Sequence, residues 1–258
     1  MRTDLRHTLR LARVDLKLLG RNHAALFNVV LLPLVFGVMI TQLGHADQVF
    51  VLTGVPGILL AFVVFANLVN AFVVRREERV LKRLRGWQPS AAAIFGGAGL
   101  AAFVIYAVQL ALFGVGIHRA GGGLPANVPL IVVASLLGVA VFTALAAAFS
   151  GPHRNAELAQ ITVTPVILVL TFATPIVYPL EALPEPLRLL AALLPATPVV
   201  EIVRTAYTGR DYIGVSGGEL SMVDQWVAAL PSFGVLLAWL VVGGLLARWL
   251  FRWDPRHG

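Results

Sequence analysis

The densest group of charged side chains in the sequence is a run of mixed sign at residues 75–86, RREERVLKRLRG. Glu78 and Lys82 have the i, i+4 spacing that supports a helix, and Gly86 followed by Pro89 is typical of a helix end. A short helix with charges of both signs suits recognition of a soluble protein surface. A solvated loop that only fixes membrane topology is an equal alternative at this point, because basic residues alone set orientation.

Residues with catalytic potential are few. Ser150-Gly151 with His153 offers a nucleophile and a base, but this sequence lacks the G-x-S-x-G context, and no second histidine lies within an apolar segment. No group of His, Asp and Glu has the spacing of metal ligands. The chain has no cysteine, which excludes disulfides and thiolate sites. We therefore expect neither an intramembrane enzyme nor a metal centre.

A phosphate-binding loop is also missing from the sequence. Such a loop is a glycine-rich turn whose backbone N–H groups and lysine hold the phosphates of ATP. The two lysines, Lys17 and Lys82, do not follow the G-x-x-x-x-G pattern. If ATP drives this protein, a separate subunit must hydrolyse it.

The apolar composition of the chain requires a lipid environment. The 258-residue chain is 58% hydrophobic and 13% charged, and a spanning helix takes about 20 apolar residues. We expect an all-α integral membrane protein with one transmembrane domain over residues 1–258. Its six predicted spans are 24–43, 50–74, 90–117, 127–149, 159–178 and 230–251.

The distribution of basic residues gives the expected orientation. Sixteen Lys and Arg lie on one side of the predicted spans and four on the other. By the positive-inside rule, both termini and the 75–86 loop are expected in the cytoplasm. The same asymmetry accounts for the net charge of +7 without nucleic-acid binding.

The N-terminal segment, 1–23, has the pattern of an amphipathic helix. Its basic residues fall within one arc of a helical wheel, and leucines and an alanine fill the neighbouring arc. An interfacial helix attracted to anionic lipid follows from this pattern, with a plain basic tail as the alternative. The segment lacks the apolar core and cleavage site of a secretory signal peptide. The basic residues are Arg2, Arg6, Arg10, Arg13, Lys17 and Arg21.

The connection between the last two spans is unusually long and apolar. It runs from Tyr178 to Trp226, with repeated prolines between short apolar stretches. Residues 187–194 and 199–207 read as helices too short to span. We expect an external re-entrant region over 179–229, which dips into the outer leaflet and returns.

The predicted spans hold neutral polar residues and no Asp, Glu, Lys or Arg at mid-depth. A proton-coupled transporter normally needs an ionisable group there, although sodium sites built from carbonyls do not. An ion-coupled secondary transporter is therefore the alternative class. The neutral groups either bond neighbouring helices or line a path. They are Asn28, Asn67, Asn70, Gln109, Gln160, Thr162, Thr164, Thr171 and Thr174.

Two segments resemble the type-2 ATP-binding-cassette (ABC) permeases, which include bacterial drug and polysaccharide exporters and are similar to the eukaryotic G-subfamily. The first is RREERVLKRLRGWQPS at 75–90, similar to the stretch where these permeases couple to their ATPase. The second is PIVYPLEALPEPLRLLAALLPATPVVEIVR at 175–204, similar to the passage before their last span. Trp87-Gln88 departs from the smaller hydroxyl residues expected there, which puts the local docking contacts in doubt.

The resemblance implies roles for particular residues. It implies a cytosolic coupling helix at 75–89, with Arg75, Arg76, Glu77, Glu78, Arg79, Lys82 and Arg83 facing the ATPase. Because the second and fifth spans border the central cavity in this family, it also implies a substrate path that includes Asn67, Asn70, Thr171 and Thr174.

The resemblance also implies the partners. One partner is a cytosolic ABC ATPase in two copies, which would hold ATP and Mg²⁺, since no cofactor is expected in this chain. The others are a second permease, either another copy of this chain or a relative, and the lipid of a bacterial inner membrane. The expected activity is outward movement of an amphipathic drug-like molecule, lipid or glycolipid.

Overall fold

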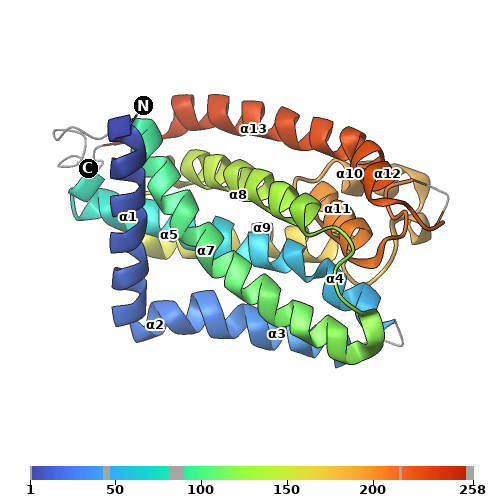
Figure 1. Cartoon of the computed structure of the whole chain (residues 1–258). Helices are drawn as coiled ribbons and strands as arrows, with labels where there is room; N and C mark the ends of the chain where they lie inside the picture. Colours follow the sequence, from blue (N-terminus) through green and yellow to red (C-terminus); the bar gives the residue numbers. More distant parts are fainter. Residues whose placement is uncertain (1, 43–46, 82–89, 215–216, 254–258) are drawn as a thin grey trace.

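The computed structural model describes residues 2–42, 47–81, 90–214 and 217–253, and their regular structure is helical apart from one bridge between Arg210 and Glu219. The long helices lie side by side, and α1 crosses one end of the bundle (Figure 1). We call this end the α1 end. The elements are α1 (Arg2–Arg21), α2 (His23–Leu26), η1 (Phe27–Leu31), α3 (Leu32–Gln42), α4 (Gln48–Leu59), η2 (Leu60–Ala66), α5 (Asn67–Glu77), α7 (Ala91–Ile117), η3 (His118–Gly122), α8 (Val128–Ser150), α9 (Ala156–Phe172), η4 (Leu180–Ala182), α10 (Glu185–Ala192), α11 (Thr197–Thr208), α12 (Met222–Ala228) and α13 (Leu230–Leu250).

Four of the six predicted spans are confirmed as helices long and apolar enough to cross a membrane. The number rises to five if the bent pair α10 and α11 forms one span. The predictions at 50–74, 90–117, 127–149 and 230–251 correspond to Gln48–Glu77, Ala91–Gly122, Val128–Ser150 and Leu230–Leu250.

The predicted spans at 24–43 and 159–178 correspond to shorter apolar helices, Val29–Met39 and Ala156–Phe172. α9 ends at Phe172, before the predicted limit, because Pro175 lacks an N–H and disfavours helical backbone at the residue before it. The helix over 24–43 contains a π-helical segment, η1.

The helix from Gln48 to Glu77 is the core of the bundle. It comprises α4, the π-helical segment η2 and α5, and 78% of its most apolar window is buried, against 17% for α13. Its side chains pack against α7, α8, α9 and α11. A displacement at one end of this helix therefore reaches most of the other helices.

The predicted N-terminal amphipathic helix is confirmed as α1. Its arginines at positions 6, 10, 13 and 21 are exposed, and Ala12 is buried against the bundle. α1 crosses α7 at Gly97, where a Cβ would lie 2.7 Å from the Leu11 Cβ atom. Glycine thus permits a closer approach of these two helices than any larger residue.

The two short helices predicted between the last spans are confirmed as α10 and α11. They are bent by 84° relative to each other. The indole N–H of Trp239 on α13 donates to the Leu193 carbonyl, at 2.7 Å, and so fixes the connection between them. The Tyr207 hydroxyl donates to the Gly114 and Gly123 carbonyls, which holds α11 against the end of α7.

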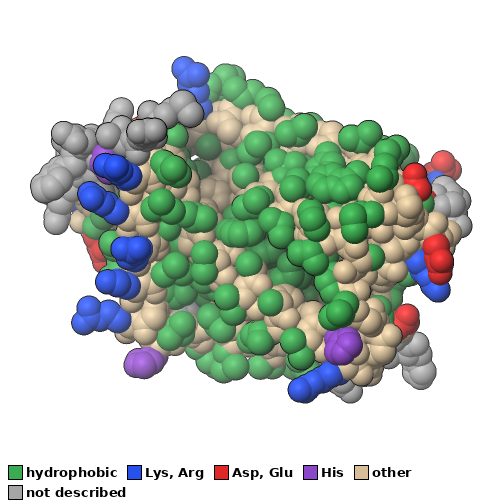
Figure 2. Space-filling model, viewed as in Figure 1, with side chains coloured by type: hydrophobic (Ala, Val, Ile, Leu, Met, Phe, Trp, Pro, Cys, Tyr) green, Lys and Arg blue, Asp and Glu red, His purple; other side chains and the backbone are tan. Residues whose placement is uncertain are grey.

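The surface has the charge pattern of a membrane protein. Lys and Arg side chains line the edge that α1 forms, and charges of both signs gather at the opposite end (Figure 2). Hydrophobic side chains cover most of the face between them. This pattern agrees with a bilayer that surrounds the middle of the bundle.

The α1–α7 crossing gives a test of this packing. Gly97→Ala should lower the free energy of unfolding by about 1–3 kcal/mol, since the added methyl group overpacks the crossing. Gly96→Ala is the matched control, because its Cβ would meet Thr8 Cγ2 at an ordinary 3.5 Å. Thermal unfolding in mild detergent would measure both variants, and equal stability of the two would contradict the close crossing.

Candidate functional site

The charged run at 75–86 begins inside a helix. Residues 75–77 form the last turn of α5, so the coupling segment predicted for 75–89 is here continuous with the core helix. Glu78 and Arg79 then form a turn in which Arg79 has a φ of 57°. This left-handed conformation reverses the chain at the end of a helix. Lys82 and Arg83 lie outside the described residues.

Arg75 connects α5 to α1. Its guanidinium lies 2.6 Å from the Asp15 carboxylate, and the two side chains are 21% and 14% exposed. An ion pair that is this far withdrawn from water is screened less than a surface pair. Arg75 therefore holds α1 across the end of α5.

Arg76 binds the connection between α8 and α9. Its side chain is 3% exposed, and its guanidinium donates to the carbonyls of Ser150, at 3.1 Å, Gly151, at 3.4 Å, and His153. Carbonyls at the end of a helix have no partner within that helix. We call this arrangement of Arg76 and its acceptor carbonyls the Arg76 clamp.

The His153 ring also stabilises the connection between α8 and α9. Its ring Nδ1 lies 2.7 Å from the Phe149 carbonyl, and Nε2 lies 2.6 Å from the Thr162 hydroxyl on α9. The Ser150 hydroxyl instead donates to the Ala147 carbonyl, at 2.8 Å. Ser150 thus bonds a backbone carbonyl, and both ring nitrogens of His153 have partners other than Ser150.

The clamp also adjoins the end of α13. A Cβ on Gly151 would lie 2.0 Å from the Leu250 carbonyl oxygen. Only glycine allows the connection between α8 and α9 to lie this close to the α13 backbone. Movement of α5 at this end would therefore act on α8, α9 and α13 together.

The exposed side chains of the charged run lie beyond the clamp. Glu77, Glu78 and Arg79 are exposed, whereas Arg75 and Arg76 are engaged within the chain. Carboxylates at a helix C-terminus are unfavourable by about 0.3–1 kcal/mol, because the helix dipole is negative there. Helix stability therefore does not explain the two glutamates.

Two of the four predicted path residues share a hollow. Asn67 and Asn70 on α5, with Gln160 and Thr164 on α9, line a cavity of about 300 Å³ that aliphatic side chains complete. Asn70, Gln160 and Thr164 are exposed, and Asn67 is half-buried. We call this cavity the Asn70 hollow.

Thr171 and Thr174 are not among the residues that line this hollow. Both are buried. Thr174 follows the end of α9, and its hydroxyl donates to the Leu170 carbonyl in the last turn of that helix. The Thr171 hydroxyl has no hydrogen-bond partner in the described part of the chain. At about 100° per residue Thr171 falls on the same face of α9 as Gln160 and Thr164, so its position further along the helix separates it from the hollow. Sequence reasoning missed Gln160 and Thr164 as lining residues, although their i, i+4 spacing places them on one face of the helix.

A second buried arginine lies at the opposite end of the bundle. Arg204 on α11 donates to the Thr53 hydroxyl, at 3.2 Å, and to three backbone carbonyls, and its guanidinium carbon lies 3.6 Å from the centre of the Phe50 ring. It thereby joins α4, α11 and the segment after α9. The carbonyls belong to Phe50, Pro175 and Ile176.

Comparison with known proteins agrees with this architecture. Residues 42–249, most of the chain, match the family described as ABC-2 family transporter protein. No curated protein matches the chain. The matched range includes both buried arginines, the four polar residues of the Asn70 hollow and the described part of the charged run.

The Arg76 clamp is testable by stability. Arg76→Gln should lower the free energy of unfolding by about 2 kcal/mol or more, because it leaves buried carbonyls without a charged donor. Arg79→Gln removes the same charge from an exposed position and should change stability by about 0.5 kcal/mol or less. Thermal unfolding in detergent separates the two variants. An equal loss of stability in both variants would show that the stability depends on the positive charge and not on the clamp.

Proposed function

This chain belongs to the ABC-2 transporter family, and we propose that it is the membrane-spanning permease subunit of an exporter driven by separate ATPase subunits. The observation that supports this function best is the exposed group Glu77, Glu78 and Arg79 at the end of the most buried helix. The absence of a phosphate-binding loop from the sequence agrees with a partner that supplies ATP hydrolysis.

The proposed assembly has two permease copies and two cytosolic ABC ATPases, with ATP and Mg²⁺ bound by the ATPases. The charged run, including Lys82 and Arg83, would contact an ATPase surface. The connection at 150–158 would be a second contact, since it is bonded to α5 through Arg76.

The proposed membrane arrangement has six spans in a bacterial inner membrane with both termini in the cytoplasm. The shorter helices around η1–α3 and α9 would be the first and fifth spans. α10 and α11 would enter the outer leaflet without crossing it, which their 84° bend supports. α1 would lie in the cytoplasmic interface, where its exposed arginines meet anionic headgroups.

The Arg76 clamp would couple movement of the ATPases to movement of the membrane helices. Closure of the ATPases on ATP would push on the segment after Arg79 and so on α5. The clamp would pass this displacement to α8 and α9, because Arg76 bonds the backbone between them. The shift would change the separation of α5 and α9 at the Asn70 hollow.

The polar residues of the Asn70 hollow are an argument for a second permease copy in the assembly. Asn70 and Gln160 carry exposed amides within helices that we place in the bilayer. An amide that faces hydrocarbon without a partner costs several kcal/mol. A water-filled cavity between two copies would satisfy both amides, and its mixed polar and aliphatic wall suits an amphipathic substrate.

We also propose a direction of transport and a substrate class. Outward movement of a drug-like molecule, lipid or glycolipid is the activity of the exporters that the charged run and the 175–204 passage resemble. An ion-coupled transporter is not favoured, because the family match covers most of the chain.

Co-purification tests the partner. The tagged chain, extracted from its native membrane in mild detergent, should bring down a cytosolic ATPase in a one-to-one ratio, identified by mass spectrometry. If the chain is recovered alone as a monomer or dimer, the exporter proposal is wrong.

A double substitution tests the coupling residues. Glu77→Gln with Glu78→Gln should reduce ATPase association or transport about tenfold, the effect of removing one or two charge-assisted contacts. Membrane insertion should be unchanged, because both side chains are exposed. Asp224→Asn, an exposed acidic residue at the opposite end, is the control. Normal coupling in the double variant would exclude these glutamates from the contact.

Cysteine cross-linking tests the second copy. Because the chain has no cysteine, Ile161→Cys on α9 gives a single reporter, which should form an intermolecular disulfide in membranes. Val241→Cys on α13 is the matched control, since the two side chains are 63% and 61% exposed. Cross-linking at Val241 but not at Ile161 would place the contact between copies elsewhere.

A further inference from the structure

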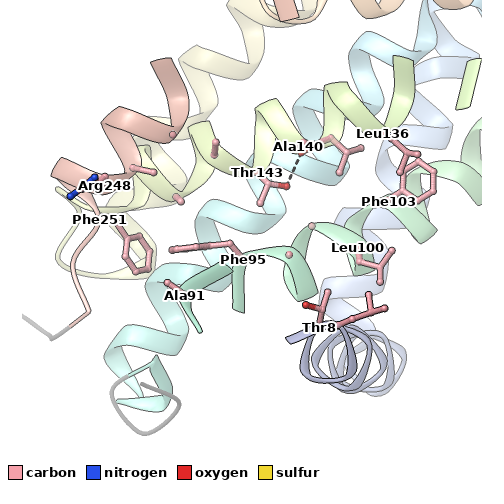
Figure 3. A pocket seen from close by; sticks show the side chains of 18 of the residues that line it. Thr8, Ala91, Phe95, Leu100, Phe103, Leu136, Ala140, Thr143, Arg248 and Phe251 are labelled. Carbon is pink, nitrogen blue, oxygen red and sulfur yellow. Dashed lines mark hydrogen bonds between the residues drawn. The ribbon is translucent and has the colours of Figure 1, made fainter. Parts of the chain in front are cut away.

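A large groove lies at the α1 end, apart from the Asn70 hollow. It has a volume of about 780 Å³, within the range of about 300–1,000 Å³ that is typical of ligand pockets. Its walls come from α1, α7, α8 and α13 and from the residues after α13 (Figure 3).

The walls of the groove are almost wholly apolar. Aliphatic and aromatic side chains line it, among them Leu100, Phe103 and Leu136. The two hydroxyls in the wall are satisfied within their own helices, because Thr143 donates to the Val139 carbonyl, at 2.7 Å, and Thr8 to the Asp4 carbonyl, at 2.9 Å. The interior therefore suits hydrocarbon, because both threonine hydroxyls donate their protons within the chain.

An aromatic cluster closes the groove toward α5. Phe95 and Phe251 line the groove and lie 4.9 Å apart between ring centres. Phe72 on α5 packs edge-on against both, at 5.4 and 5.9 Å. The floor is thus rigid and adjoins the core helix.

The mouth of the groove is basic. Arg248, in the last turn of α13, lies beside Phe251 and across the groove from Thr8 (Figure 3). Arg248 is exposed, and no described acidic side chain forms an ion pair with it. α1, which carries the exposed Arg6 and Arg10, lies at the same end of the bundle (Figure 1). Among the described residues, the acidic residue nearest this wall in sequence is Asp4, which accepts a hydrogen bond from Ser90, at 2.9 Å.

From this geometry we infer a binding site for one anionic phospholipid of the adjoining leaflet. An acyl chain occupies the groove, and the phosphate lies against the Arg248 guanidinium, which binds phosphate oxygens in a fork. The lipid is a resident ligand of the permease, separate from the path between two copies. The inference does not depend on the ATPase partnership.

Native mass spectrometry of the full chain tests the site. The protein is reconstituted in vesicles of phosphatidylcholine and phosphatidylglycerol in equal amounts and then extracted in mild detergent. Wild type should retain one phosphatidylglycerol in preference to phosphatidylcholine.

Two pairs of variants separate the acyl site from the headgroup site. Gly244→Leu should fill the groove and release the lipid, whereas Gly234→Leu on the same helix should not release it. The two positions are matched because a Cβ at either meets no atom within 4 Å, but of the two only Gly244 lines the groove. Arg248→Gln should reduce the preference for phosphatidylglycerol about tenfold, as expected for one charge-assisted hydrogen bond. The exposed Arg252 gives the control, Arg252→Gln.

Three outcomes would overturn the proposal. Equal retention by the Gly244→Leu and Gly234→Leu variants would place bound lipid outside the groove. Equal retention of both phospholipids by wild type would remove the role of Arg248. An intermolecular disulfide at Gly244→Cys would show that a second copy of the chain covers the groove.

Discussion

Backbone carbonyls at helix ends inside an apolar bundle must find donors, and two buried guanidiniums meet this requirement at opposite ends of the molecule. Arg76 binds carbonyls where α8 connects to α9. Arg204 binds the Phe50 carbonyl in the first turn of α4 and the Pro175 and Ile176 carbonyls after the end of α9. A carbonyl left without a donor in such surroundings costs about 1–3 kcal/mol. The positions of α5, α8, α9 and α11 depend on these contacts.

The two arginines differ in their surroundings. Arg204 is surrounded by its acceptors and the Phe50 ring, and its role is to hold the segment after α9 against α4. Arg76 lies next to exposed glutamates at the end of the same core helix. A charge at that position both fixes the connection between α8 and α9 and joins it to the surface that an ATPase would contact.

Much of the fold follows from the sequence because long apolar runs and helical periodicity are local signals. Four spans, the amphipathic α1 and the short helices α10 and α11 were predictable in this way. The inward turn of Arg75 and Arg76 was not, because nothing in a mixed-charge run distinguishes an arginine that finds Asp15 or a carbonyl from one that faces water. Thr171 and Thr174 were chosen by span alone, and both are buried: Thr171 lies further along α9 than the residues of the Asn70 hollow, and Thr174 lies beyond the end of that helix. The early end of α9 follows from Pro175, whose effect on the preceding residues outweighs the apolar run.

The acceptors of the Arg76 clamp are main-chain oxygens, and this has an evolutionary consequence. Every residue type carries a carbonyl, so substitutions at Ser150 or His153 leave the acceptors of Arg76 in place. Selection on the clamp would thus preserve the arginine and the path of the backbone while the partner side chains diverge. Statistical coupling between position 76 and positions 150–153 in an alignment would be weak even though the physical contact is strong. Gly151 is the exception, because its fit against Leu250 excludes any side chain.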